Sequence, residues 1–101
     1  MVNKIEWSLN AVNQVEGILE FLTKEVSENA AAKFLETVLS KVKSLEHNTY
    51  EGRPVPNMRT VRFVIFEKHH RLYYRRHGRT LFITNVYDTR QNPDKRPYFK
   101  K

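Results

Sequence analysis

The chain has 101 residues, a formal net charge of +7 and no cysteine. This length fits one domain over residues 1–101 with a modest core, and the absence of cysteine excludes a disulfide framework and thiolate chemistry. No apolar run approaches the length of a membrane span and no apolar signal segment opens the chain, so we expect a cytoplasmic protein without a membrane partner.

The charge is divided between the two halves of the chain. Residues 1–51 carry five Lys and eight Glu, whereas residues 52–101 carry 13 Lys and Arg against three Asp and Glu. In the basic half, Arg alternates with Tyr and Phe. Such a surface attracts polyanions, of which nucleic acid is the most common. A solvated basic face that only maintains solubility is the alternative.

The first half predicts a short strand and two helices. The strand covers residues 4–7, and Ser8 after it is a suitable N-cap. Apolar residues then recur at helical spacing in two stripes, and Ser27 and Asn29 mark the break between them. Gly17 within the first stripe suggests a close helix crossing. The stripes are Val12, Val15, Ile18, Leu19, Leu22 and Val26, then Ala31, Phe34, Leu35, Val38, Leu39, Val42 and Leu45.

The second half predicts a loop followed by three strands. Residues 48–57 contain Gly52, Pro54 and Pro56 and are expected to form the loop. β-branched and aromatic runs predict strands at residues 61–66, 71–76 and 80–87, with a tight hairpin at His77-Gly78. This order predicts an α+β fold, in which an N-terminal strand and a two-helix hairpin pack on a twisted antiparallel sheet.

Strand alternation separates the side chains of the second predicted strand. Leu72 and Tyr74 share one face, while Arg71, Tyr73 and Arg75 share the other. An Arg-Tyr-Arg face can pair with phosphates and stack on bases, or its Tyr can simply cover apolar neighbours. The candidates for nucleic-acid binding are Arg59, Arg62, Tyr73 and Arg75.

We expect no metal and no cofactor. His69 and His70 are adjacent, so in a strand they would point to opposite faces, and His47 and His77 are isolated. Structural roles are the better interpretation of these residues. With three Gly in the whole chain, no glycine-rich nucleotide-binding motif is present.

One metal-free reaction is compatible with these residues, namely cleavage of RNA by its own 2′-hydroxyl. It requires a base, cations for the developing negative charge and an acid for the leaving oxygen. Arg71, Arg75 and Arg90 would supply the cations, and Tyr73, Tyr87 or a His would stack or donate a proton. The catalytic candidates are therefore Arg71, Arg90 and Tyr87.

Four segments together resemble the RelE/ParE superfamily of toxins from type II toxin–antitoxin systems. They are IEWS, the helical hairpin, the loop GRPVP and the stretch HHRLYYRRHGRTLFITNVYDTRQNP. The resemblance covers nearly the whole chain. It implies a cognate antitoxin as partner, and a target that is either mRNA on the ribosome, which some members cut, or DNA gyrase, which others inhibit.

Part of the chain departs from the nuclease members. In the YoeB-like branch the GRPxP loop carries a Glu base, at the position of Val55 here, and a His-Tyr pair follows the last strand, where this chain has Tyr87-Asp88-Thr89-Arg90. Arg71 matches a catalytic position. Our first expectation is a ribosome-dependent mRNA endonuclease. The alternatives are a gyrase inhibitor without catalytic activity and a non-toxic nucleic-acid-binding module.

Overall fold

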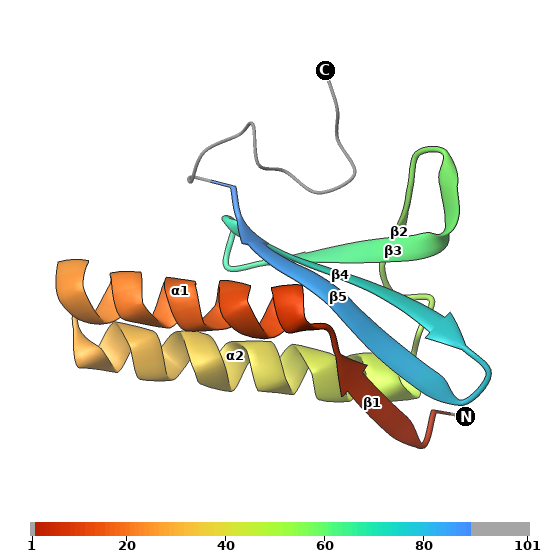
Figure 1. Cartoon of the computed structure of the whole chain (residues 1–101), viewed down its shortest axis with the longest axis horizontal. Coiled ribbons are helices and arrows are strands. Elements are labelled where there is room, and N and C mark those ends of the chain that lie inside the picture. The colour runs from red at the N-terminus through yellow and green to blue at the C-terminus, as the bar shows by residue number, and fades with distance from the viewer. Residues whose placement is uncertain (1, 90–101) are drawn as a thin grey trace.

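The computed structural model describes residues 2–89, in which two helices lie against one face of a five-stranded sheet (Figure 1). The predicted α+β architecture is thereby confirmed. The elements are β1 (Lys4–Trp7), α1 (Leu9–Glu25), α2 (Glu28–His47), β2 (Arg53–Val55), β3 (Met58–Phe66), β4 (His70–His77) and β5 (Thr80–Asp88). Neither described helix is apolar enough over its length to cross a membrane.

Both helices begin at a serine N-cap. The Ser8 Oγ accepts a hydrogen bond from the amide of Ala11 at 3.0 Å, and the Ser27 Oγ accepts one from Ala30 at 3.0 Å. Each cap satisfies an amide that has no partner within the helix. The Ser8 hydroxyl also donates to the carbonyl of Thr84 at 2.7 Å. The cap of α1 therefore also fixes the helix to β5.

The buried helix stripes are narrower than the sequence predicts. Val12 on α1 and Val26 directly after it are exposed, as are Leu35 and Leu39 on α2. The buried face of α1 is centred on Ala11, so Val12, one residue further around the helix, faces away from the sheet. The buried positions are Ala11, Val15, Ile18 and Leu22, then Ala31, Phe34, Val38, Val42 and Leu45.

The sheet has the order β1-β5-β4-β3-β2, and every pairing is antiparallel except the parallel pairing of β1 with β5. The segment predicted as loop contains β2, which is a correction. Pro54 has no amide hydrogen and therefore suits an edge strand, where one side needs no partner. The register with β3 shifts between Pro54 and Val55.

The turns on either side of β4 differ in how clearly the sequence predicts them. Gly78 has φ of +62° in the two-residue turn between His77 and Thr80, as the His77-Gly78 pattern predicts. In the turn between β3 and β4, Glu67 and Lys68 have φ of +50° and +65°. These residues occupy the left-handed region without the help of glycine, so no turn signal marks them in the sequence.

The sheet carries a separate apolar cluster on each face. The larger one joins both helices to the sheet, and the smaller one lies on the opposite face and contains Val55, Val61, Phe63, Tyr73 and Tyr87. His70 belongs to the helix side, where its ring centroid lies 4.7 Å from that of Phe34 and 5.2 Å from that of Phe66. This packing fits the structural role expected of it.

The segment between α2 and β2 is fixed at both ends. The carboxylate of Glu51 accepts hydrogen bonds from the Lys41 ammonium at 2.9 Å and the Ser44 hydroxyl at 2.8 Å. The Gly52 amide donates to the Tyr74 hydroxyl at 2.9 Å, and that hydroxyl donates to the carbonyl of Thr49 at 2.8 Å. The segment therefore follows the sheet closely.

Gly52→Ala should destabilise the protein, because a Cβ at this position would lie 2.6 Å from the Phe63 carbonyl oxygen and 2.7 Å from the Tyr74 hydroxyl. We expect a loss of about 1–3 kcal/mol in the free energy of unfolding, measured by urea titration.

Gly17→Ala is the matched control. Its Cβ would meet nothing within 4 Å, which also excludes the close helix crossing suggested by the sequence. This variant should be about 0.5–1 kcal/mol more stable. Equal changes in the free energy of unfolding of the two variants would contradict the close packing described around Gly52.

Glu51→Gln should reduce the dependence of stability on acid pH. Hydrogen bonds from Lys41 and then Ser44 hold the pKa of Glu51 below its ordinary value of 4.5. The carboxylate therefore stabilises the fold above that value, and this contribution is lost as the pH falls through the lowered pKa. At pH 7 the variant should be less stable by under about 1 kcal/mol, and the difference should be smaller at pH 3. Glu16→Gln, on the exposed side of α1, is the control in urea titrations at both pH values.

Candidate functional site

The sheet face opposite the helices carries the predicted Arg-Tyr-Arg row. Within β4, Arg71 lies opposite Tyr87 of β5, Tyr73 opposite Phe63 of β3, and Arg75 opposite Phe82 of β5. Leu72 and Tyr74 belong to the cluster on the helix side. The predicted separation of the two faces is confirmed by this register.

Both arginines of this row lie over aromatic rings. The guanidinium carbon of Arg71 is 5.1 Å from the centroid of Phe63, and that of Arg75 is 4.6 Å from the centroid of Phe82. Such cation–π contacts hold a guanidinium in place without neutralising its charge. Arg71 is half-buried, whereas Arg75 is exposed.

The two tyrosines predicted at the site are buried. Tyr73 is 0% exposed and Tyr87 is 6% exposed, both within the smaller apolar cluster. The Tyr73 ring packs at 5.6 Å from Phe63. In this structure it therefore covers apolar neighbours, and the predicted stacking on a base would require the ring to be uncovered. Of the predicted catalytic residues, Arg71 and Tyr87 are cross-strand neighbours, and Arg90 lies outside the described residues.

Val55 is one of the buried residues that make this sheet face apolar. The side chain is 2% exposed and belongs to the same cluster as Tyr73 and Tyr87. An isopropyl group cannot accept a proton, and a carboxylate at this depth would have to leave water. Tyr87, the cross-strand neighbour of Arg71, thus shares an apolar cluster with Val55, which stands at the position where YoeB-like members have their base.

Four arginines meet at the other end of the sheet, where β3 begins and β4 ends. They surround a pocket of about 200 Å³, which we call the arginine pocket. Three of the four residues predicted for nucleic-acid binding come together here, and Tyr73 does not. The lining residues are Thr49, Tyr50, Arg59, Thr60, Arg62, Tyr74, Arg75 and Arg76.

Hydrogen bonds fix two of these guanidinium groups. Arg62 Nη1 donates to the Gly52 carbonyl at 2.7 Å, and its guanidinium lies 5.0 Å from the centroid of Tyr50. Arg76 Nε donates to the Gly78 carbonyl at 2.8 Å, and its Nη1 donates to the Thr49 hydroxyl at 3.4 Å. Sequence reasoning missed Arg76 and Tyr50. Arg76 follows Arg75 directly, but strand alternation assigned it to the other face, whereas at a strand end both faces contribute to one pocket.

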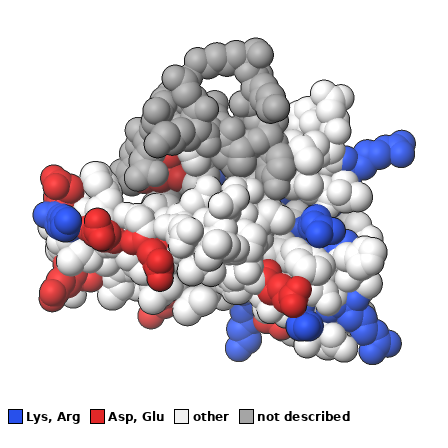
Figure 2. Space-filling model, in the orientation of Figure 1, with Lys and Arg blue, Asp and Glu red and all other residues white. Residues whose placement is uncertain are grey.

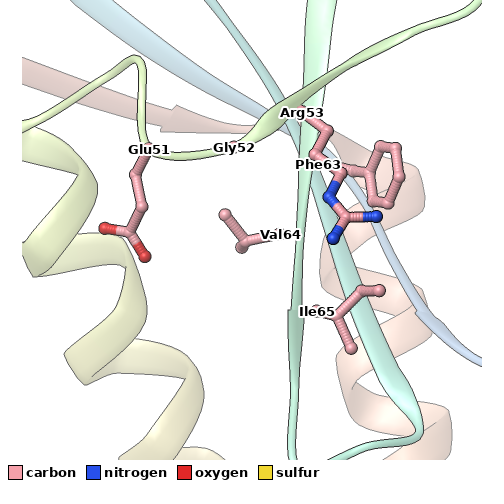
Figure 3. A pocket seen from close by; sticks show the side chains of 6 residues that line it. All are labelled: Glu51, Gly52, Arg53, Phe63, Val64 and Ile65. Atoms are coloured by element: carbon pink, nitrogen blue, oxygen red, sulfur yellow. The ribbon is translucent and has the colours of Figure 1, made fainter.

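A groove runs along β3 beside the loop that follows α2. It measures about 210 Å³ and is lined by Glu51, Gly52, Arg53, Phe63, Val64 and Ile65. Figure 3 shows the Glu51 side chain on the side of α2 and Arg53 beside Phe63, with Val64 between them. Among the described strands, none pairs with β3 on this side beyond Phe63. Together with Ile65, which is 45% exposed, this leaves an apolar strand edge accessible.

Charge is segregated between the two ends of the molecule. In Figure 2, most of the visible carboxylates lie over the helices, and most Lys and Arg side chains lie at the opposite end, over the sheet. Within residues 2–89, no three His, Asp or Glu side chains converge as metal ligands would. Binding of anions by the Lys and Arg side chains at the sheet end is therefore the main chemistry that the described surface offers.

Comparison with known proteins agrees with this architecture. A family model described as the ParE toxin of the type II toxin–antitoxin system parDE matches residues 5–93. A chain of the chromosomal ParDE system from P. aeruginosa superposes with a TM-score of 0.71 at 18% sequence identity, over 84% of this chain and 94% of that one. A YoeB/ParE toxin from Agrobacterium tumefaciens gives 0.64 at 17% identity, over 85% and 98%.

The structural matches have low sequence identity and show a shared fold. No curated protein sequence matches the chain. The family model, by contrast, spans most of the chain, including the strands that carry Arg71, the GRPVP loop and the arginine pocket. The chain therefore belongs to the ParE family of type II toxin–antitoxin toxins, within the RelE/ParE superfamily.

Proposed function

We propose that this toxin inhibits DNA gyrase by binding and has no nuclease activity of its own. The observation that carries the proposal is Val55, which is buried in an apolar cluster at the position where YoeB-like nucleases have a Glu base. The resemblance gives gyrase as the target of the ParE-like members, which lack that Glu, and the match to the ParE model supports this branch.

A second candidate function is ribosome-dependent cleavage of mRNA. The specific observation in its favour is the cross-strand pair of Arg71 and Tyr87, a cation beside a phenol on one sheet face. With Val55 in place of a Glu base, the ribosome would have to position the RNA for in-line attack and provide most of the gain from orientation. Arg71 would then neutralise charge on the reacting phosphate.

Purified toxin should block supercoiling by gyrase and leave translated mRNA uncut. The first readout is a plasmid supercoiling assay, and the second is primer extension on a message translated in vitro. New RNA ends that depend on ribosomes, with normal supercoiling, would contradict the proposal.

The Arg71→Ala variant separates the two candidates further. If Arg71 stabilised a cleavage transition state, its loss should reduce cleavage by about 100-fold or more. For an inhibitor that only binds, the same change should shift the inhibitory concentration by roughly tenfold at most. Arg53→Ala removes the same charge from exposed β2 and is the matched control.

The toxin family implies a cognate antitoxin. We propose that an antitoxin segment occupies the groove along β3, because the open strand edge offers backbone hydrogen bonds and Ile65 offers an exposed apolar contact. The acidic character expected of such a segment would suit the basic end of the sheet.

Co-expression with the product of the adjacent gene should abolish growth arrest and give a stoichiometric complex on purification. Ile65→Asp should weaken that complex by about tenfold or more, since the new carboxylate would be buried in an apolar contact. Leu39→Asp, on the exposed side of α2, should bind normally. The affinity of each variant for the antitoxin is measured by calorimetry. Equal weakening of binding in both variants would exclude the groove as the docking site.

A further inference from the structure

Among the residues that the structure describes, the lining of the arginine pocket combines four guanidinium groups with no carboxylate. Like charges at close range repel one another, so an arrangement of this kind reduces stability unless a ligand neutralises it. The nearest acid in sequence, Glu51, is held away from the pocket by Lys41 and Ser44 of α2.

The pocket is also ordered before any ligand arrives. Arg62 and Arg76 are fixed by backbone carbonyl acceptors, and each guanidinium has five N–H donors, so further donors can reach a ligand. Arg75 is held over Phe82, and the hydroxyls of Thr49 and Thr60 line the same space. Fixed donors lose little conformational entropy on binding, which favours affinity.

Tyr50 adds an aromatic surface at the edge of the pocket. It is 73% exposed, although one side of its ring carries the Arg62 guanidinium. An exposed ring beside clustered arginines can contact a sugar or a base while the arginines bind the phosphate. A peptide carboxylate needs only one arginine fork, whereas several converging forks suit the oxygens of a phosphate.

We infer that the arginine pocket binds a backbone phosphate of nucleic acid, and that the toxin contacts nucleic acid directly through Arg59, Arg62, Arg75 and Arg76. This inference goes beyond the proposed inhibition of gyrase. Binding by the toxin alone needs neither gyrase nor ribosomes, so its outcome is separate from that of the supercoiling and cleavage assays.

The test is fluorescence anisotropy with purified toxin and two labelled probes of equal length, a DNA duplex and a single-stranded RNA, at several salt concentrations. Arg59→Ala and Arg76→Ala should each weaken binding roughly tenfold, the value of one charge-assisted hydrogen bond. For the duplex, each lost phosphate contact should reduce the slope of log affinity against log salt by about 0.9. Arg59 is exposed, so Arg59→Ala remains informative if Arg76→Ala fails to fold.

Arg53→Ala, which removes the same charge from outside the pocket, should bind within about twofold of the unchanged protein. Arg59→Lys should be intermediate, because it keeps the charge and loses the fork. Pocket-dependent binding of either probe supports the inference, and the tighter probe identifies the nucleic acid. Equal losses in Arg53→Ala and Arg59→Ala, no binding of either probe, or displacement of both by an acidic peptide of equal charge would overturn it.

Discussion

The Tyr74 hydroxyl is the contact on which the functional end of the molecule depends. It accepts a hydrogen bond from the Gly52 amide and donates one to the Thr49 carbonyl, so a single buried atom joins β4 to both sides of Tyr50 and Glu51. Burial raises the pKa of this hydroxyl, which keeps it neutral and able to donate. Because the folded pKa is raised, this contribution is present below about pH 10 and is lost as the pH rises through the folded value. The Gly52 carbonyl in turn positions Arg62.

A sheet with an apolar cluster on each face leaves little room for charge at its centre. The helices cover one face, and Val55, Phe63 and their neighbours occupy part of the other. The arginines of β3 and β4 other than Arg71 gather at the end where β3 begins and β4 ends, where long cationic side chains can reach water. The acidic side chains lie mainly on the outer surfaces of the helices (Figure 2). The charge asymmetry between the two halves of the sequence thus becomes an asymmetry between the two ends of the molecule.

Periodicity predicted the helices, β1, β3, β4 and β5, because each buries one regular face. It could not predict β2, since Pro54 and the flanking turn residues are typical of loops and the strand exists only through pairing with β3. Nor could it predict the turn at Glu67 and Lys68, whose left-handed backbone is imposed by its flanking strands. At the site, alternation placed Arg71, Tyr73 and Arg75 on the correct face, but burial of Tyr73 depends on tertiary packing. Arg76 was missed because two-fold alternation no longer sorts side chains at a strand end.

The residues brought together at this surface are better equipped for binding than for proton transfer. A guanidinium remains protonated at any physiological pH, so arginine can neutralise a phosphate and cannot act as its base. Val55, which occupies the position of the Glu base of YoeB-like members, is buried among apolar side chains on the sheet face that carries Arg71. Four arginines, two of them fixed by backbone carbonyls, remain at the end of the sheet. This arrangement suits the binding of an anionic partner surface, which is the mode of action that our proposal of inhibition without cleavage requires.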